Sequence, residues 1–154
     1  MLLLLLAACR PAAVLPTDPP ATLDPANIDS ASLRLELFVD DVQTSVDFYT
    51  GVLGFDMSYG DSSYAVVRAG SVSFGIGPKD GLGRDHYFNP ELGEQRGGLG
   101  VEIVIEVDDV QNLYDAVVAS GWPRESELEE RSWGLTDFRV ADPDGYYLRL
   151  TSRE

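Results

Sequence analysis

The chain has 154 residues, 44% of them hydrophobic, which is enough for one domain with its own core. It carries 26 acidic and 11 basic side chains, so its surface, with a formal net charge of -15, repels nucleic acid and anionic lipid. Such a charge attracts cationic ligands, although solubility or adaptation to salt is also a sufficient explanation. One cysteine excludes an internal disulfide, and one histidine excludes a metal centre built from several histidines.

The N-terminus is typical of a segment that is processed after synthesis. Residues 1–8 are apolar, end in small alanines and are too few to span a bilayer as a helix. Residues 6–9 read Leu-Ala-Ala-Cys and resemble the lipobox of bacterial lipoproteins, in which the cysteine is lipidated. We therefore predict a signal at residues 1–9, lipidation at Cys9, and an exported protein that meets the membrane only through this anchor. An unprocessed apolar N-terminus on a cytoplasmic protein is the alternative.

The segment after the signal has the composition of a tether. Residues 10–32 are rich in proline and alanine and show no sustained period, which is typical of an extended, poorly ordered chain. We predict that the folded domain begins at residue 33.

A five-residue sequence occurs twice in the rest of the chain. Val-Asp-Asp-Val-Gln stands at residues 39–43 and again at 107–111. Both copies follow alternating apolar residues, as in a strand with one buried face, and both precede a helical pattern. Two copies at this spacing indicate two similar halves of one domain rather than a solenoid. We predict one domain at 33–152, with modules at about 33–77 and 101–152.

The first module is predicted to contain a strand, a helix and three more strands. Apolar residues alternate over 33–39, and Asp40 and Gln43 then have the spacing of a capping box. The helical pattern continues to Leu53 and meets a C-cap glycine at Gly54. Three short strands separated by turn residues are expected at 55–59, 64–68 and 72–76.

A linker at residues 78–100 joins the modules and carries His86. Loops of this length without secondary structure are uncommon in compact domains and often have a function. The linker either covers a cleft or is a solvated crossing between the modules. A lone loop histidine does not support a catalytic role.

The second module repeats the order of the first. Its strand at 101–107 leads into a capping box of Asp108 and Gln111, and its helix ends near Ser120 and Gly121. The remaining strands are expected at about 124–130, a polar edge strand, at 135–140, and at 146–151 after an Asp-Pro-Asp-Gly turn. Helices should cover one face of the strands, and the other faces then form a shared concave surface.

These motifs resemble the glyoxalase/bleomycin-resistance/extradiol-dioxygenase superfamily, also called vicinal oxygen chelate. Residues 48–55, with Phe-Tyr and then Leu-Gly-Phe, match its opening module. Trp133-Gly134 and the Asp-Pro-Asp-Gly turn match its closing signature. The resemblance implies an α+β fold of two βαβββ modules, each a cup-shaped half-barrel. It also implies a small-molecule ligand in the cup and a homodimer.

The resemblance further implies four positions for metal ligands. In this sequence they hold Arg34, Glu102, Arg149 and, depending on a one-residue shift, Phe74 or Gly75. Only one of them is a carboxylate, whereas a divalent cation needs three or four oxygen or nitrogen donors. The two guanidinium groups stay charged and repel a cation. We therefore expect neither a bound metal nor a cofactor. This expectation argues against the metal-dependent reactions of glyoxalases and dioxygenases.

An ionic and aromatic cleft is expected in place of the metal. Arg34, Glu102 and Arg149 should face one another across the cup, either as an ion network that satisfies itself or as a polar floor for a ligand. Paired arginines hold a carboxylate or phenolate, glutamates hold an amine, and aromatic rings supply walls, although core packing also explains the rings. The predicted cleft comprises Arg34, Glu36, Phe38, Tyr64, Glu102, Glu106, Trp133, Tyr147 and Arg149.

Three functions remain open. We favour a metal-free binding protein, similar to bleomycin-resistance proteins, that sequesters a cationic or aromatic small molecule. The alternative is a metal-dependent glyoxalase-type lyase, isomerase or dioxygenase with atypical ligands, or metal-free acid/base work by Glu36 or Glu102. A third possibility is an assembly module with an empty cleft. No catalytic residue is assigned.

Overall fold

The computed structural model describes residues 32–88 and 97–153. The predicted signal at 1–9, its lipidation site Cys9 and nearly all of the predicted tether at 10–32 lie outside the described residues. Within the described part of the chain, no helix is long and apolar enough to cross a membrane.

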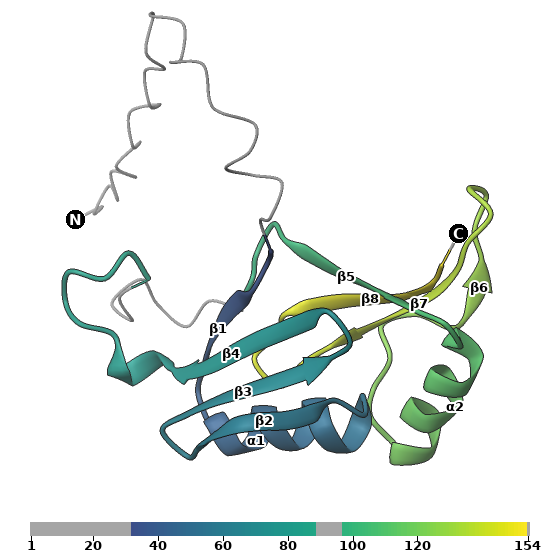
Figure 1. Ribbon diagram of the computed structural model, residues 1–154. Coiled ribbons are helices and arrows are strands. Elements are labelled where there is room, and N and C mark those ends of the chain that lie inside the picture. The colour runs from purple at the N-terminus through teal and green to yellow at the C-terminus, as the bar shows by residue number, and fades with distance from the viewer. Residues whose placement is uncertain (1–31, 89–96, 154) are drawn as a thin grey trace, which may run out of the picture. The chain divides into compact units, whose positions relative to one another are not determined.

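The described residues form two modules with the same order of elements (Figure 1). The first contains β1 (Leu35–Val39), α1 (Val42–Asp47), the π-helix η2 (Phe48–Val52), β2 (Asp56–Asp61), β3 (Tyr64–Ala69) and β4 (Val72–Pro78). A 3-10 turn, η3 (Lys79–Gly81), follows. The second contains β5 (Glu102–Val107), α2 (Val110–Ser120), β6 (Glu129–Glu130), β7 (Thr136–Ala141) and β8 (Tyr147–Ser152).

Each module builds one four-stranded sheet. The strand orders are β1-β4-β3-β2 and β5-β8-β7-β6, and in each sheet the first strand pairs with the last in parallel while the other pairs are antiparallel. This confirms the predicted α+β class and its two βαβββ modules. The matching topologies explain why the repeated five-residue sequence stands at the same strand-to-helix junction in both modules.

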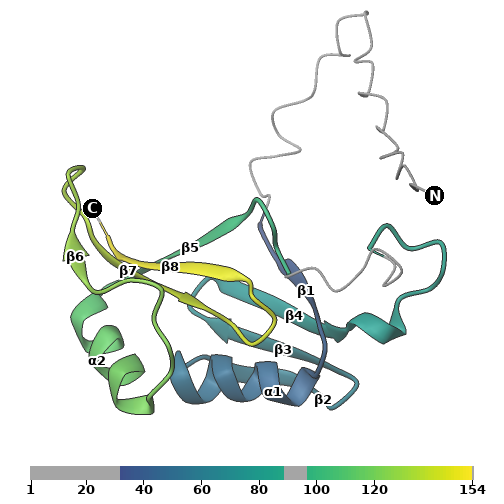
Figure 2. The same ribbon diagram turned by 180° about the vertical axis from the view of Figure 1, so that it is seen from behind.

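Each helix covers one face of its own sheet. In Figures 1 and 2, α1 lies against β3 and β4, and α2 lies against β7 and β8. Leu37 and Val39 of β1 are buried on the helix side, whereas Glu36 and Phe38 point to the other face, as the alternation predicts. The helix-side residues of both modules belong to one hydrophobic core.

The faces that the helices leave uncovered are called the first and second open faces. The first open face includes Arg34, Glu36, Phe38, Tyr64, Val66, Arg68, Ser73, Gly75 and Gly77. The second open face consists of Glu102, Val104, Glu106, Asp137, Arg139, Tyr147, Arg149 and Thr151.

The capping of α1 differs from the prediction by one residue. Asp41 is the N-cap, and its carboxylate accepts a hydrogen bond from the backbone N–H of Thr44 at 2.6 Å. This bond holds the pKa of Asp41 below its ordinary value. The predicted capping box of Asp40 and Gln43 is therefore wrong, and Gln43 donates along the helix to Asp47 instead. The run of two aspartates allows either residue to cap, and the second one does.

The capping of α2 repeats this correction. Asp109 rather than Asp108 is the N-cap and accepts from the backbone N–H of Asn112 at 2.9 Å. Gln111 donates to a side chain one turn further along, so the second predicted capping box is also wrong. The predicted end of the helix is confirmed, since Gly121 follows α2 in the left-handed conformation with φ 76°.

The predicted strand at 124–130 is wrong except for its last two residues, which form β6. Glu125 and Ser126 lie beside β7, where both backbone N–H groups donate to the carbonyl of Arg139. The N–H of Arg139, however, donates to the Ser126 hydroxyl at 3.1 Å instead of to a backbone carbonyl. Because a side-chain hydroxyl takes the place of a backbone carbonyl as acceptor, the regular β-ladder is interrupted here. The other strands begin and end within two residues of their predicted bounds.

A turn of the second module joins it to the first. Asp142, between β7 and β8, is buried and accepts a hydrogen bond from the hydroxyl of Tyr49 in η2 at 2.9 Å. Asp144 accepts from the backbone N–H of Asp40 at 2.7 Å and from Lys79 Nζ at 2.8 Å. The turn, together with the shared core, therefore sets the two sheets against each other.

Candidate functional site

The first open face holds a carboxylate–phenol pair over a glycine. The Tyr64 hydroxyl donates to Glu36 at 3.0 Å, and Arg34 forms an ion pair with the same carboxylate at 2.5 Å. Burial, followed by this bond to Glu36, raises the pKa of Tyr64. Gly75 is the register partner of Glu36, and a Cβ at Gly75 would lie 2.2 Å from Glu36 Oε2 and 2.3 Å from the Tyr64 hydroxyl. The glycine therefore makes room for the pair.

A Gly75→Ala substitution is expected to separate this pair without unfolding the protein, because both obstructing atoms end mobile side chains. A double-mutant cycle of Glu36→Ala and Tyr64→Phe should give a coupling free energy of about 1 kcal/mol in the native background. In the Gly75→Ala background we expect the coupling to vanish. Gly51→Ala is the matched control, since a Cβ there meets nothing within 4 Å. Equal coupling in both backgrounds would contradict the role given to Gly75.

An aromatic cluster lies next to this pair. The ring of Phe38 is 5.3 Å from that of His86, nearly perpendicular to it, and 5.7 Å from that of Phe88. The first described residues of the linker thus fold back against the first open face instead of crossing freely through solvent. Phe38 is also held by its backbone, since the Tyr146 hydroxyl bonds to both its N–H and its carbonyl.

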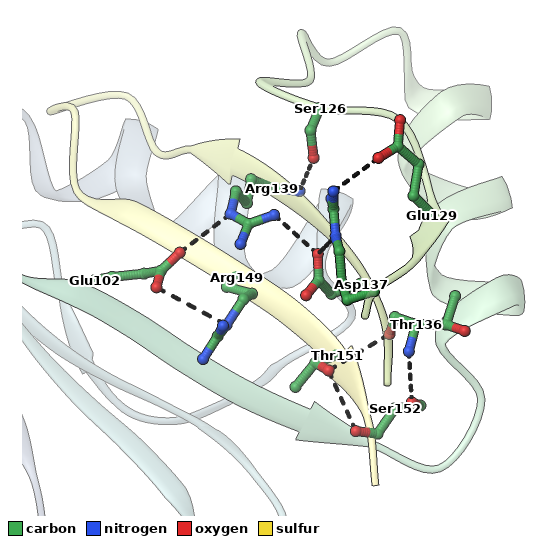
Figure 3. Close-up of polar contacts among 10 residues, drawn as sticks. Glu102, Ser126, Glu129, Thr136, Asp137, Arg139, Arg149, Thr151 and Ser152 are labelled. Atoms are coloured by element: carbon green, nitrogen blue, oxygen red, sulfur yellow. Dashed lines mark hydrogen bonds and ion pairs between the residues drawn. The ribbon is translucent and has the colours of Figure 1, made fainter. Parts of the chain in front are cut away.

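The second open face holds an ion network around a fully buried aspartate (Figure 3). Asp137 Oδ1 accepts from Arg131 Nε at 2.7 Å and from Arg139 Nη1 at 2.8 Å. Arg139 Nε donates in turn to Glu102 at 3.1 Å. Arg149 approaches the other oxygen of Glu102 only to 3.9 Å, which is too long for a hydrogen bond.

The structure divides the predicted cleft between two faces. Arg34, Glu36, Phe38 and Tyr64 belong to the first open face, and Glu102, Glu106, Tyr147 and Arg149 belong to the second. The expected cluster of Arg34, Glu102 and Arg149 forms only in part: Glu102 and Arg149 meet, whereas the ion pair of Arg34 is made with Glu36. Trp133 is exposed in the turn between β6 and β7. The ligand roles of these residues stay predictions.

The sequence interpretation missed Arg131, Asp137 and Arg139. A usable signal existed for two of them. Within the predicted strand at 135–140, Asp137 and Arg139 alternate with the apolar Phe138, which places the aspartate and the arginine on the face away from the helix. Arg131 follows the predicted strand at 124–130, so no strand pairing predicts its position. Only the folded turn brings it to Asp137.

A pocket of about 390 Å³ adjoins the second open face. It is lined by residues 97–102 together with Gly145 and Tyr147. Two of the predicted cleft residues, Glu102 and Tyr147, therefore border it. They are also register partners on β5 and β8.

The donor set at the family's metal positions does not fit a divalent cation. On the open faces these positions hold Arg34, Gly75, Glu102 and Arg149, since Phe74 is buried on the helix side. Glu102 is already engaged by arginine. Nowhere in residues 32–88 and 97–153 do three His, Cys, Asp or Glu side chains gather so that they could hold a metal ion.

Comparisons with known proteins agree with the fold. Residues 31–150 match the family model described as Glyoxalase/Bleomycin resistance protein/Dioxygenase superfamily. The chain is similar to the solved structure of TioX from Micromonospora sp. ML1, with 21% identity and a TM-score of 0.64 over 80% of this chain and 99% of that one. It is also similar to lactoylglutathione lyase from Agrobacterium tumefaciens, with 21% identity and a TM-score of 0.60 over 80% and 93%. No curated protein matches.

Proposed function

Because the chain belongs to the glyoxalase/bleomycin resistance protein/dioxygenase superfamily, we propose that it binds a small molecule on its open faces without a metal ion. The observation that carries the proposal is the state of Glu102. It is the one carboxylate among the family's metal positions, and it is bound to Arg139 at 3.1 Å with Arg149 on its other side. A cation at Glu102 would have to displace an arginine and then lie beside two permanent positive charges.

The first open face supports an aromatic or cationic ligand. Phe38, His86 and Phe88 provide a ring cluster beside the carboxylate of Glu36, whose partner Arg34 is 57% exposed and can turn into solvent when a ligand binds. Aromatic rings attract a cation through their faces, and a net charge of -15 draws cations toward the protein. This chemistry supports a protein that sequesters a cationic or aromatic small molecule, as the name of the bleomycin-resistance proteins implies for them.

A homodimer and export are further parts of the proposal. Val101, which directly precedes β5, and Val104 within β5 are exposed in the single chain, with 56% and 42% of their surface accessible. Burying them against a second copy would remove this apolar surface from water. Export with a lipid at Cys9 is supported by the sequence of residues 1–9.

The metal content of the purified protein tests the proposal. After incubation with manganese, nickel, zinc or iron(II) and removal of free ion, mass spectrometry should find no metal above the buffer background. The matched variant Arg149→Glu restores a carboxylate beside Glu102 and is expected to bind metal more strongly than the native chain, because it replaces a repelling charge with a donor. About one tightly held ion per native chain would overturn the proposal and favour a metal-dependent lyase or dioxygenase.

A further inference from the structure

The second open face offers a ligand chemistry opposite to that of the first. We propose that it binds the carboxylate of a small organic acid, with Arg149 as the principal donor and the ligand body in the glycine-lined pocket beside Tyr147. This rests on the proposed function, since it names a ligand class for one of the two open faces.

Arg149 is the arginine of the ion network for which the described residues supply no hydrogen bond, whereas Arg131 and Arg139 both donate to Asp137. Its side chain is only 25% exposed, and its Nε is buried without a hydrogen-bond partner among the described residues. Within the part of the chain that the structure describes, its one ionic contact is Glu102 at 3.9 Å. Of the five N–H donors of this guanidinium, the one on Nε is shielded from water without an acceptor, which is unfavourable, and the others remain free to turn toward a ligand. An acceptor from outside the chain would therefore be bound strongly here.

The neighbouring Arg139 differs because the protein itself satisfies it. Arg139 and Arg149 are register partners on β7 and β8, so two positive charges lie directly opposite each other. Arg139 is fixed between Glu102 and Asp137 (Figure 3), so of these two arginines Arg149 is the one able to bind a new partner. An added anion would also reduce the repulsion between the two arginines.

The pocket is the place where the rest of the ligand, beyond its carboxylate, would lie. Tyr147 stands two residues before Arg149 on β8, so both side chains emerge on the same face. Tyr147 and Glu102 line the pocket of about 390 Å³, a volume at the small end of known ligand sites. An acid on Arg149 can thus extend along Tyr147 into it, and only a small one fits.

Two glycines of the pocket wall pack closely against Tyr146. A Cβ at Gly97 or Gly98 would lie 2.7 Å from the ring of Tyr146. That ring cannot move freely, because its hydroxyl bonds to the backbone of Phe38 at 3.0 Å. Gly97 and Gly98 therefore cannot carry a side chain where they pack on Tyr146, and the pocket's side chains come from Leu99, Val101, Glu102 and Tyr147.

Calorimetric titration of the full chain with benzoate tests the inference, with neutral benzamide as the matched ligand. Benzoate is expected to bind about tenfold or more tightly than benzamide, as one charge-assisted hydrogen bond supports. Arg149→Gln should abolish this preference, and Arg149→Lys should restore part of it because the charge remains without the planar fork. Arg68→Gln, an exposed arginine on β3, is the control and should bind like the native chain.

Three results would overturn this inference without overturning the proposed function. The first is equal binding of benzoate and benzamide, and the second is a preference that survives Arg149→Gln in a variant whose circular dichroism is native. The third is binding of inorganic phosphate as tight as that of benzoate, which would show an unspecific anion site. In each case, aromatic amines that still bind the metal-free protein would leave the proposed function standing. Benzoate binding that a chelator abolishes would overturn both proposals, because it would require a metal.

Discussion

Replacing Asp137 with alanine is expected to lower the free energy of unfolding by about 3–5 kcal/mol, the cost typical of removing one partner from a buried ion pair. Asp137 is fully buried and serves two arginines through one oxygen, Arg131 at 2.7 Å and Arg139 at 2.8 Å. Without it, two guanidinium groups that are each 18% exposed lose their shared counter-ion. Urea denaturation followed by circular dichroism measures the loss.

Glu129→Ala provides the matched control for this experiment. Glu129 also forms an ion pair with Arg131, at 2.7 Å, but its side chain is 59% exposed. An exposed pair contributes less than about 1 kcal/mol. Similar losses for Asp137→Ala and Glu129→Ala would contradict the view that burial makes Asp137 the centre of the network.

The Asp137 network also bears on the ligand site. Arg139 is held in place by Asp137 on one side and Glu102 on the other. In the Asp137→Ala variant, Arg139 loses one of its two fixed partners. It can then bind Glu102 more closely or compete with Arg149 for an anion. Loss of stability and altered anion binding should therefore appear together in Asp137→Ala, whereas Arg149→Gln affects binding alone.

The sequence predicts those parts of the fold that depend on local periodicity. Alternation along residues 33–39 and 101–107 identifies the buried and open faces of β1 and β5, and the repeat identifies the two modules. Which aspartate caps each helix is not predictable from spacing, because adjacent carboxylates satisfy the same rule. The π-helix at the end of α1 is likewise invisible to a helical period.

The site is less predictable than the fold because its contacts cross elements. Glu102 and Arg149 could be paired from the family pattern alone, but Arg139 reaches Glu102 only through the register of β7 on β8 and of β8 on β5. The contact of His86 with Phe38 depends on how the linker folds back. Neither distance is encoded in a local motif.

The junction between the modules is expected to make stability depend on pH. Burial raises the pKa of Asp142 from its ordinary value of 3.8 to about 6, and the negative charge of Asp144 adds to this, while hydrogen bonds from Tyr146 and Tyr49 oppose it. The folded protein therefore holds the Asp142 proton more tightly than the unfolded chain. Stability from this group is greatest below pH 4, falls between pH 4 and 6, and is constant above.

Asp142→Asn isolates this effect, because asparagine stays neutral at every pH and keeps an acceptor for the backbone N–H groups of Asp144 and Tyr146. Relative to the native chain, the variant should gain about 3 kcal/mol of stability between pH 4 and pH 7, measured by urea denaturation at each pH.

Asp61→Asn is the control. The pKa of Asp61 is lowered by hydrogen bonds from Ser63, so its contribution is lost as pH falls and its slope has the opposite sign. A stability difference between Asp142→Asn and the native chain that does not change with pH would mean that Asp142 is ionised in the folded protein throughout this range. The Tyr49 hydroxyl would then be stabilising a buried charge, and the junction would not weaken as pH rises from 4 to 7.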